Sequence, residues 1–224
     1  NAMLAQAAPT AMLKALGDNR VRTAYALGRL SSAAALLDIV VSPQLGRLSD
    51  TVGRRPLLIL PPAIALLCRG TAAVRPSIGV IVALRVLQST LSSTYMVALR
   101  ATVADQFRDN ADALAERIGL MSAATGVAYF IGMLAGGRLV AAGIQLPYLA
   151  SAALLGLLVP LVGVVHRETL PPSQRAPFGL RPPAVGFLRL FSSGRALRGL
   201  STVSVLHTIS MGMGDTWQVF AREL

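Results

Sequence analysis

Two long stretches of this chain carry no charged side chain, residues 118–137 and residues 139–165. A helix that crosses the hydrocarbon core of a bilayer needs about 20 predominantly apolar residues. Both stretches reach that length, and several shorter apolar runs precede them. The sequence therefore predicts a chain of membrane-spanning helices, which makes it a multi-pass integral membrane protein.

The composition leads to the same conclusion. Hydrophobic residues make up 54% of the chain and charged residues 14%, whereas a soluble domain usually has about 25% charged residues. Much of the surface must therefore face lipid. The net charge of +11 would suit a nucleic-acid binder, but the arginines recur between apolar runs instead of clustering on a polar surface. We expect a lipid bilayer as partner and no nucleic acid.

The apolar segments define the expected organisation of the chain. Six of them are expected to form helices, with approximate bounds 21–45, 57–74, 77–104, 114–139, 146–166 and 200–220. Residues 1–16 look like the end of a further helix whose beginning is missing. Residues 167–198 contain five prolines and few aliphatic runs, which predicts a linker.

Residue types that carry catalysis or bind metals are scarce. The chain has one cysteine and two histidines, which gives neither an internal disulfide nor a metal-ligand pattern. It has no glycine-rich phosphate loop and no arrangement typical of a hydrolase. We expect a protein that is not an enzyme and that uses no metal or cofactor.

Residues 46–55, GRLSDTVGRR, form a short charged segment between two apolar runs. Gly46 and Gly53 supply the backbone freedom that a tight turn needs. The arginines of the segment cannot enter hydrocarbon and so mark a membrane face. The spacing of the glycines, the leucine, the aspartate and the two final basic residues resembles the signature loop of the major facilitator superfamily of transporters.

The resemblance implies an all-α membrane protein with a helical bundle of the major facilitator type, incomplete, with about six spanning helices of an expected twelve. Residues 1–166 would be the N-terminal six-helix half with a truncated first helix. Residues 167–198 would be the cytoplasmic central linker and residues 199–224 the truncated first helix of the C-terminal half. A complete pathway would then need the missing C-terminal half or a second chain. With the signature segment on the cytoplasmic side, that side also has the excess of basic residues that topology requires.

Asp50 is the candidate gating residue, together with Gly46, Gly53, Arg54 and Arg55 of the same segment. One interpretation is a latch, in which its carboxylate pairs with one of the arginines or with a facing helix N-terminus and stabilises the state closed to the cytoplasm. The other is a turn-forming aspartate that caps local amides. The complete match of the segment favours the latch.

Arg85 interrupts the apolar segment 77–104, and Gln88 follows it three residues later. The pair resembles a fourth-helix pattern of the superfamily, although Ser89 replaces the glycine of that pattern. The resemblance implies a role in proton coupling or in binding an anionic group. Because a charge within a span is costly, it usually faces a wet cavity or a partner. A structural salt bridge is the alternative.

Asp38 is the second charge within an apolar segment and a further candidate for coupling or substrate binding. A carboxylate there is a candidate proton carrier, because burial in a medium of low dielectric constant disfavours its charged form. Equally, Asp38 could pair with an arginine near the cytoplasmic mouth, such as Arg100 or Arg117. The sequence leaves both interpretations open.

Two further patterns lie between residues 104 and 137. Gly132 and Gly136 have the small-x-x-x-small spacing that lets helices approach closely, and with Gly137 they resemble the fifth-helix motif of proton antiporters, without its proline. Asp105 and Arg117 resemble residues that tetracycline-efflux-type transporters carry at the end of the fourth helix and the start of the fifth. We expect these two to form an ion pair between the helices.

The resemblance implies secondary active transport of a small organic solute by alternating access, with proton-coupled efflux as the expected mode. The partners would be the bilayer, a small-molecule substrate and protons. An alternative of another class is a truncated pseudo-transporter that moves no solute and acts as a membrane interaction module. Neither substrate identity nor the coupling ion follows from the sequence.

Overall fold

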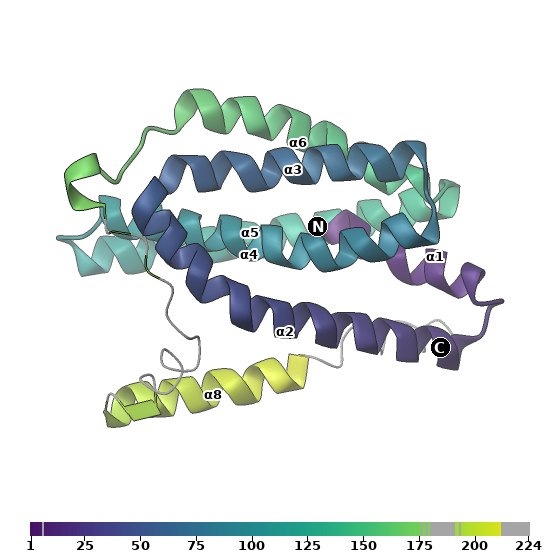
Figure 1. Cartoon of the computed structure of the whole chain (residues 1–224), viewed down its shortest axis with the longest axis horizontal. Helices are drawn as coiled ribbons and strands as arrows, with labels where there is room; N and C mark the ends of the chain where they lie inside the picture. Colours follow the sequence, from purple (N-terminus) through teal and green to yellow (C-terminus); the bar gives the residue numbers. More distant parts are fainter. Residues whose placement is uncertain (6, 176, 178, 180–190, 193, 212–224) are drawn as a thin grey trace.

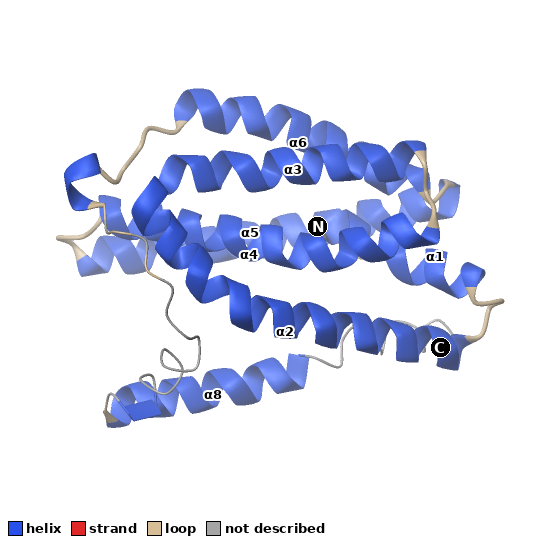
Figure 2. Ribbon diagram, viewed as in Figure 1, coloured by secondary structure: helices blue, strands red, loops and turns tan. Residues whose placement is uncertain are grey.

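The computed structural model describes the chain except residues 6, 176, 178, 180–190, 193 and 212–224. Within the described residues every regular element is a helix (Figure 2). In chain order these are η1 (Ala2–Leu4), α1 (Ala7–Ala15), α2 (Arg20–Val52), α3 (Arg54–Val74), α4 (Ile78–Gln106), α5 (Ala111–Ala142), α6 (Gln145–Val165), η2 (Pro172–Gln174) and α8 (Arg195–Met211).

Five of these helices are long and apolar enough to cross a membrane, as judged by length and composition: Arg20–Val41 of α2, and α3, α4, α5 and α6. They correspond to the first five predicted segments and confirm an all-α, multi-pass membrane protein. The sixth predicted segment, residues 200–220, overlaps α8. Its described apolar part, Leu197–Leu206, is shorter than a span, and residues 212–224 lie outside the described part of the chain.

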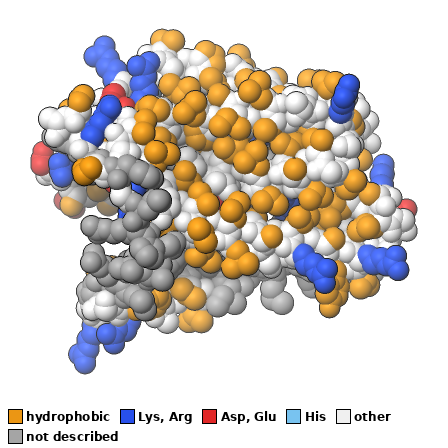
Figure 3. Space-filling model, in the orientation of Figure 1, with side chains coloured by type: hydrophobic (Ala, Val, Ile, Leu, Met, Phe, Trp, Pro, Cys, Tyr) orange, Lys and Arg blue, Asp and Glu red, His pale blue; other side chains and the backbone are white. Residues whose placement is uncertain are grey.

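The helices form a bundle in which α3 packs most extensively against α6 and α4, and α2 packs along α4 (Figure 1). The buried core is small and divided into three clusters, each made of a few residues. Many large apolar side chains lie on the outside, over the flanks of the helices, while basic side chains gather toward the helix ends (Figure 3). This inside-out distribution suits a bundle whose solvent is lipid.

Polar caps set where three of the helices begin. The side chains of Asn19, Ser77 and Asn110 accept hydrogen bonds from backbone N–H groups in the first turns of α2, α4 and α5. Such caps satisfy N–H groups that have no partner within the helix. Helix α3 differs, because the residue at its N-cap position is Gly53, which has no side chain.

The signature segment is mostly helical, which corrects the expectation of a loop with two glycine hinges. Helix α2 continues through Gly46 and ends only at Val52, so Gly53 alone separates α2 from α3. Gly53 has φ +111°, a conformation that L side chains rarely adopt. Figure 1 shows α2 bending before it meets α3, and Pro43, which removes one helical hydrogen bond, lies within this helix.

The glycines of α5 face the start of the chain. Gly132 and Gly136 are both buried on α5, and a Cβ atom built on them would lie 2.7 Å from Ala2 Cβ and 2.5 Å from the Met3 carbonyl oxygen. Helix α5 therefore approaches η1 at a distance that only glycine allows. Gly137, the next residue, is half-buried.

Candidate functional site

The guanidinium of Arg54 is the centre of a polar network at the junction of α2 and α3. Its Nη1 donates to Asp50 Oδ1 at 2.6 Å and to Ser49 Oγ at 2.9 Å. Its Nε donates to Asp105 Oδ2, near the end of α4, at 3.0 Å. The network, defined as Ser49, Asp50, Arg54 and Asp105, thus ties together the ends of three helices.

Burial makes this network energetically important. Only 9% of Arg54 is exposed, so its charge depends on the two carboxylates rather than on water. The carboxylates keep part of their hydration, because the side chains of Asp50 and Asp105 are 49% and 29% exposed. An arginine buried with its partners is costly to leave unpaired, so the arrangement fixes α4 against the α2–α3 junction.

The structure corrects the expected partner of Asp105 and gives Arg54 and Arg55 different contacts. Asp105 pairs with Arg54, and not with Arg117, whose guanidinium lies 5.8 Å from the centre of the Phe107 ring. The reason is packing: α3 contacts α4 far more extensively than α5 does. Arg55 points elsewhere, and its Nη2 donates to the Gly163 carbonyl oxygen of α6 at 2.6 Å.

Glu168, just beyond α6, supplies the N-cap that Gly53 cannot. Its Oε1 accepts from the backbone N–H of Arg54 at 2.9 Å and of Leu170 at 3.1 Å, and its Oε2 accepts from the N–H of Arg55 at 3.2 Å. The Nη2 atom of Arg175 lies 4.0 Å from Oε2 of Glu168. Desolvation favours a higher pKa for Glu168, but these backbone hydrogen bonds, with the charge of Arg175, together lower its pKa. The carboxylate also lies at the positive end of the α3 dipole.

We expect Glu168→Gln to destabilise the bundle by about 1 kcal/mol at pH 7, as loss of a helix cap does. The folded-state pKa of Glu168 lies below the unfolded value of 4.5. The ionised carboxylate therefore contributes its full stabilisation of the folded state above about pH 4.5, and this contribution is lost as the pH falls through the folded-state pKa. Thermal unfolding in detergent between pH 7 and pH 3 measures the difference.

In the same titration, Glu116→Gln serves as the control, because Glu116 is exposed on α5. This variant should unfold at the same temperature as the wild type at each pH of the titration. A Glu168→Gln variant as stable as the wild type at pH 7 would exclude the capping role.

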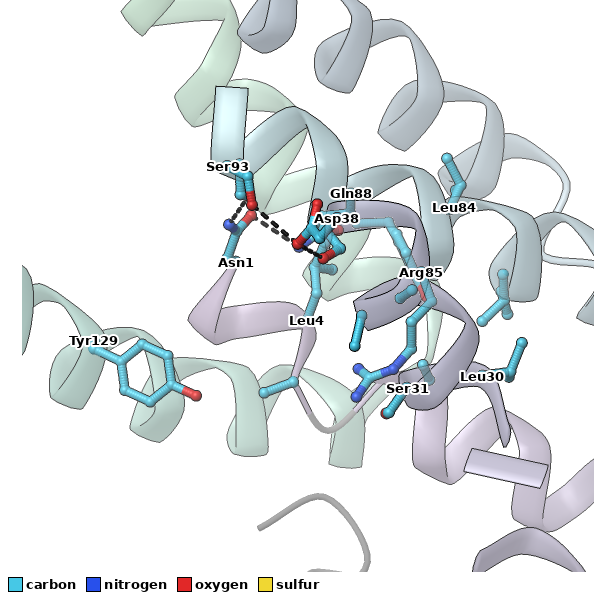
Figure 4. A pocket seen from close by; sticks show the side chains of 18 residues that line it. Asn1, Leu4, Leu30, Ser31, Asp38, Leu84, Arg85, Gln88, Ser93 and Tyr129 are labelled. Atoms are coloured by element: carbon cyan, nitrogen blue, oxygen red, sulfur yellow. Dashed lines mark hydrogen bonds between the residues drawn. The ribbon is translucent and has the colours of Figure 1, made fainter. Parts of the chain in front are cut away.

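A second polar site lies between α2 and α4, where a cavity of about 480 Å³ holds Asp38, Arg85 and Gln88 (Figure 4). The Asp38 Oδ2 atom accepts from the hydroxyls of Ser89 at 2.7 Å and Ser93 at 3.0 Å. Its Oδ1 atom is buried and has no hydrogen-bond partner. A carboxylate with one satisfied and one open oxygen is prepared to accept a proton or a donor from a ligand.

The structure thus separates Asp38 from the arginines considered as its partners. Hydroxyls one turn apart on α4 hold it, not Arg100 or Arg117. Arg85 lines the same cavity, and in Figure 4 its side chain extends toward Ser31, away from Asp38. Gln88 Nε2 donates to the side-chain oxygen of Asn1 at 2.8 Å.

Several polar contacts involve residues to which the sequence analysis assigned no role: Ser49, Ser89, Ser93 and Glu168. Ser89 and Ser93 look like ordinary residues of an apolar helix until the packing of α2 on α4 places them against Asp38. Ser49 instead accepts a hydrogen bond from Arg54 at the α2–α3 junction. Glu168 had one sequence signal, since a helix that follows a glycine has no side-chain cap of its own and needs an acceptor from elsewhere. Among the described residues, no group of three or more His, Cys, Asp or Glu side chains could hold a metal ion.

Proteins with similar sequences include three resistance proteins. The chain is 35% identical over 192 residues to the tetracycline resistance protein, class C, of Escherichia coli. The aligned region covers 86% of this chain and 46% of that protein. The chain is 28% identical over 219 residues to the class G protein of Vibrio anguillarum, covering 96% and 54%. Multidrug resistance protein 2 of Bacillus subtilis is 28% identical over 152 residues, covering 66% and 37%.

The chain therefore spans about half the length of the curated relatives that it matches. The sequence model of the Major Facilitator Superfamily matches residues 1–221. Because this match covers nearly the whole chain, and because the described helices form a multi-pass bundle, the chain belongs to the Major Facilitator Superfamily.

Proposed function

We propose that the chain forms part of a proton-coupled exporter of small organic solutes. The observation that carries this proposal is the cavity between α2 and α4, in which Asp38 presents an open carboxylate oxygen inside the bundle. An ionisable group within a membrane span marks a substrate or proton pathway by default. The names of the relatives, tetracycline and multidrug resistance proteins, support a drug-like solute.

Alternating access supplies the mechanism of the proposal. The network of Ser49, Asp50, Arg54 and Asp105 would act as the latch on the cytoplasmic side, because it holds the ends of α2, α3 and α4 together. For the bundle to open there, at least one of these ion pairs would have to break. Arg85, which lines the same cavity, would balance the charge of a bound solute.

Asp38→Asn tests proton coupling, because asparagine keeps the shape of the side chain and removes its titration. The longest natural form of the protein is placed in proteoliposomes with an imposed pH gradient. Tetracycline is the first probe, and proton movement is followed with an internal pH dye. We expect the wild type to couple the two fluxes and Asp38→Asn to fall to the level of protein-free liposomes.

Asp109→Asn is the matched control, because Asp109 is exposed in the α4–α5 connection, and it should transport like the wild type. Proton-linked transport that survives in Asp38→Asn would reject Asp38 as the proton carrier. A wild type that moves neither solute nor protons, although it is folded and inserted, would favour the alternative, a membrane interaction module.

A further inference from the structure

A buried arginine that no sequence pattern identified forms a polar cradle with two residues of α4. Arg69 Nη2 and Gln88 Nε2 both donate to the Oδ1 atom of Asn1, the latter at 2.8 Å, and the Nδ2 atom of Asn1 donates to Ser92 Oγ. The cradle, defined as Arg69, Gln88 and Ser92, therefore surrounds a planar carboxamide. Asn1, Gln88 and Ser92 also line the cavity that contains Asp38.

Arg69 lies in the last two turns of the membrane-spanning helix α3. It is only 7% exposed, and it stands five residues before the end of α3, about 7 Å along the helix axis. Among the described residues no carboxylate forms an ion pair with it, and its hydrogen bond is to the neutral side chain of Asn1. A charge in this position is costly and needs a partner of opposite sign.

We propose that Arg69, Gln88 and Ser92 form a binding subsite for the carboxylate group of an amphiphilic organic substrate. The carboxamide of Asn1 shows the geometry, because it has the same planar shape as a carboxylate. Its Oδ1 atom stands in for one carboxylate oxygen, between two donors. Its Nδ2 atom stands in for the other, and the Ser92 hydroxyl can donate to an oxygen there as readily as it accepts from nitrogen.

The rest of the cavity suggests the shape of the substrate. Leu30, Ile81 and Leu84 line it beside the polar groups, which suits an apolar or aromatic body attached to the carboxylate. Asp38 lies in the same cavity with its open Oδ1 atom. It would repel a second carboxylate and accept a hydrogen bond from a donor on the substrate. This selectivity rests on the proposed transport function, whereas binding itself does not require transport.

Equilibrium binding to the protein in nanodiscs tests the subsite, with 2-naphthoate as the probe and 2-naphthamide as its neutral isostere. Hydrogen bonds to charged groups contribute enough to change affinity by about 10- to 100-fold. We expect the wild type to bind the acid about tenfold more tightly than the amide, and Arg69→Gln to abolish this preference by weakening the acid more than the amide. Arg75→Gln is the matched control, because Arg75 is exposed at the end of α3.

Asn1→Ala provides a second variant that is expected to fold, since it removes only the internal occupant of the cradle. It should bind 2-naphthoate more tightly than the wild type, which a purely structural role of the Asn1 contacts does not predict. Equal affinities for acid and amide in the wild type, or no gain in Asn1→Ala, would overturn the subsite. A selective subsite in a protein that fails the proteoliposome assay would leave this inference standing and reject the proposed transport.

Discussion

Replacement of Arg54 by glutamine is expected to abolish transport and to lower the free energy of unfolding by about 2–4 kcal/mol. The variant removes the charge that Asp50 and Asp105 share and leaves a polar side chain in a buried position. This loss of stability is smaller than the loss expected when one partner of a fully buried ion pair is removed, because both carboxylates retain contact with water. The junction of α2 with α3 and the end of α4 would then separate more easily.

Arg55→Gln is the matched control, because it makes the same change at the next residue. Arg55 is exposed, and its side chain donates a hydrogen bond to a carbonyl oxygen of α6. We expect a loss of less than about 1 kcal/mol for an exposed polar contact of this kind and transport close to that of the wild type. Thermal unfolding in detergent and proteoliposome transport measure both effects. Equal behaviour of the two variants would show that charge at the membrane face, and not the network, is what matters.

Asp50→Asn separates gating from stability within the same network. Asp50 is half-exposed, so its neutral variant should unfold at nearly the wild-type temperature, insert normally and yet lose transport. Arg54 would keep Asp105 as its partner. Normal transport by Asp50→Asn would reject the latch while leaving the structural role of Arg54 intact.

Gly53→Ala is the second substitution with a large expected effect. The backbone conformation at Gly53, φ +111° and ψ 168°, is essentially restricted to glycine and costs another residue about 1–3 kcal/mol. In addition, the new Cβ atom would lie 2.5 Å from Glu168 Oε2. The carboxylate would have to leave the N-terminus of α3, which removes about 1 kcal/mol more.

Gly46→Ala is the control from the same signature segment. Gly46 lies within α2, and a Cβ atom there would meet Val97 at 4.0 Å, an ordinary contact. Alanine also favours the helix by about 1 kcal/mol relative to glycine, so this variant should be as stable as the wild type or more so. Thermal unfolding decides between them: if Gly53→Ala is no less stable than Gly46→Ala, the strained junction has no role.

The spans and the position of the signature segment could be predicted from the sequence, because both depend on local properties. A charge-free run of 20 residues is favourable in hydrocarbon wherever it lies in the fold, and arginines stay at a membrane face for the same reason. The prediction of a loop for the signature segment was wrong, and the reason is again local. Two glycines suggested a loop, but only Gly53 leaves the helical region, and α2 includes Gly46.

The partners of Asp105 and Asp38 could not be predicted, because they depend on which helices pack together. Asp105 has several arginines within reach in sequence, and only the extensive contact of α3 with α4 selects Arg54. The same holds for Asp38, for which the sequence suggested arginines and the packing of α2 on α4 supplies two serine hydroxyls.

The sequence by itself thus determined that this chain is a bundle of membrane-spanning helices with the family's signature segment at one face, since transfer into lipid and short-range motifs are properties of single segments. Only the tertiary structure decided that Glu168 caps α3, that Arg54 joins three helices and that Arg69 lies in a polar cradle. These contacts join residues 51 to 114 positions apart. Their formation depends on distances between helices, which no local pattern of residues specifies.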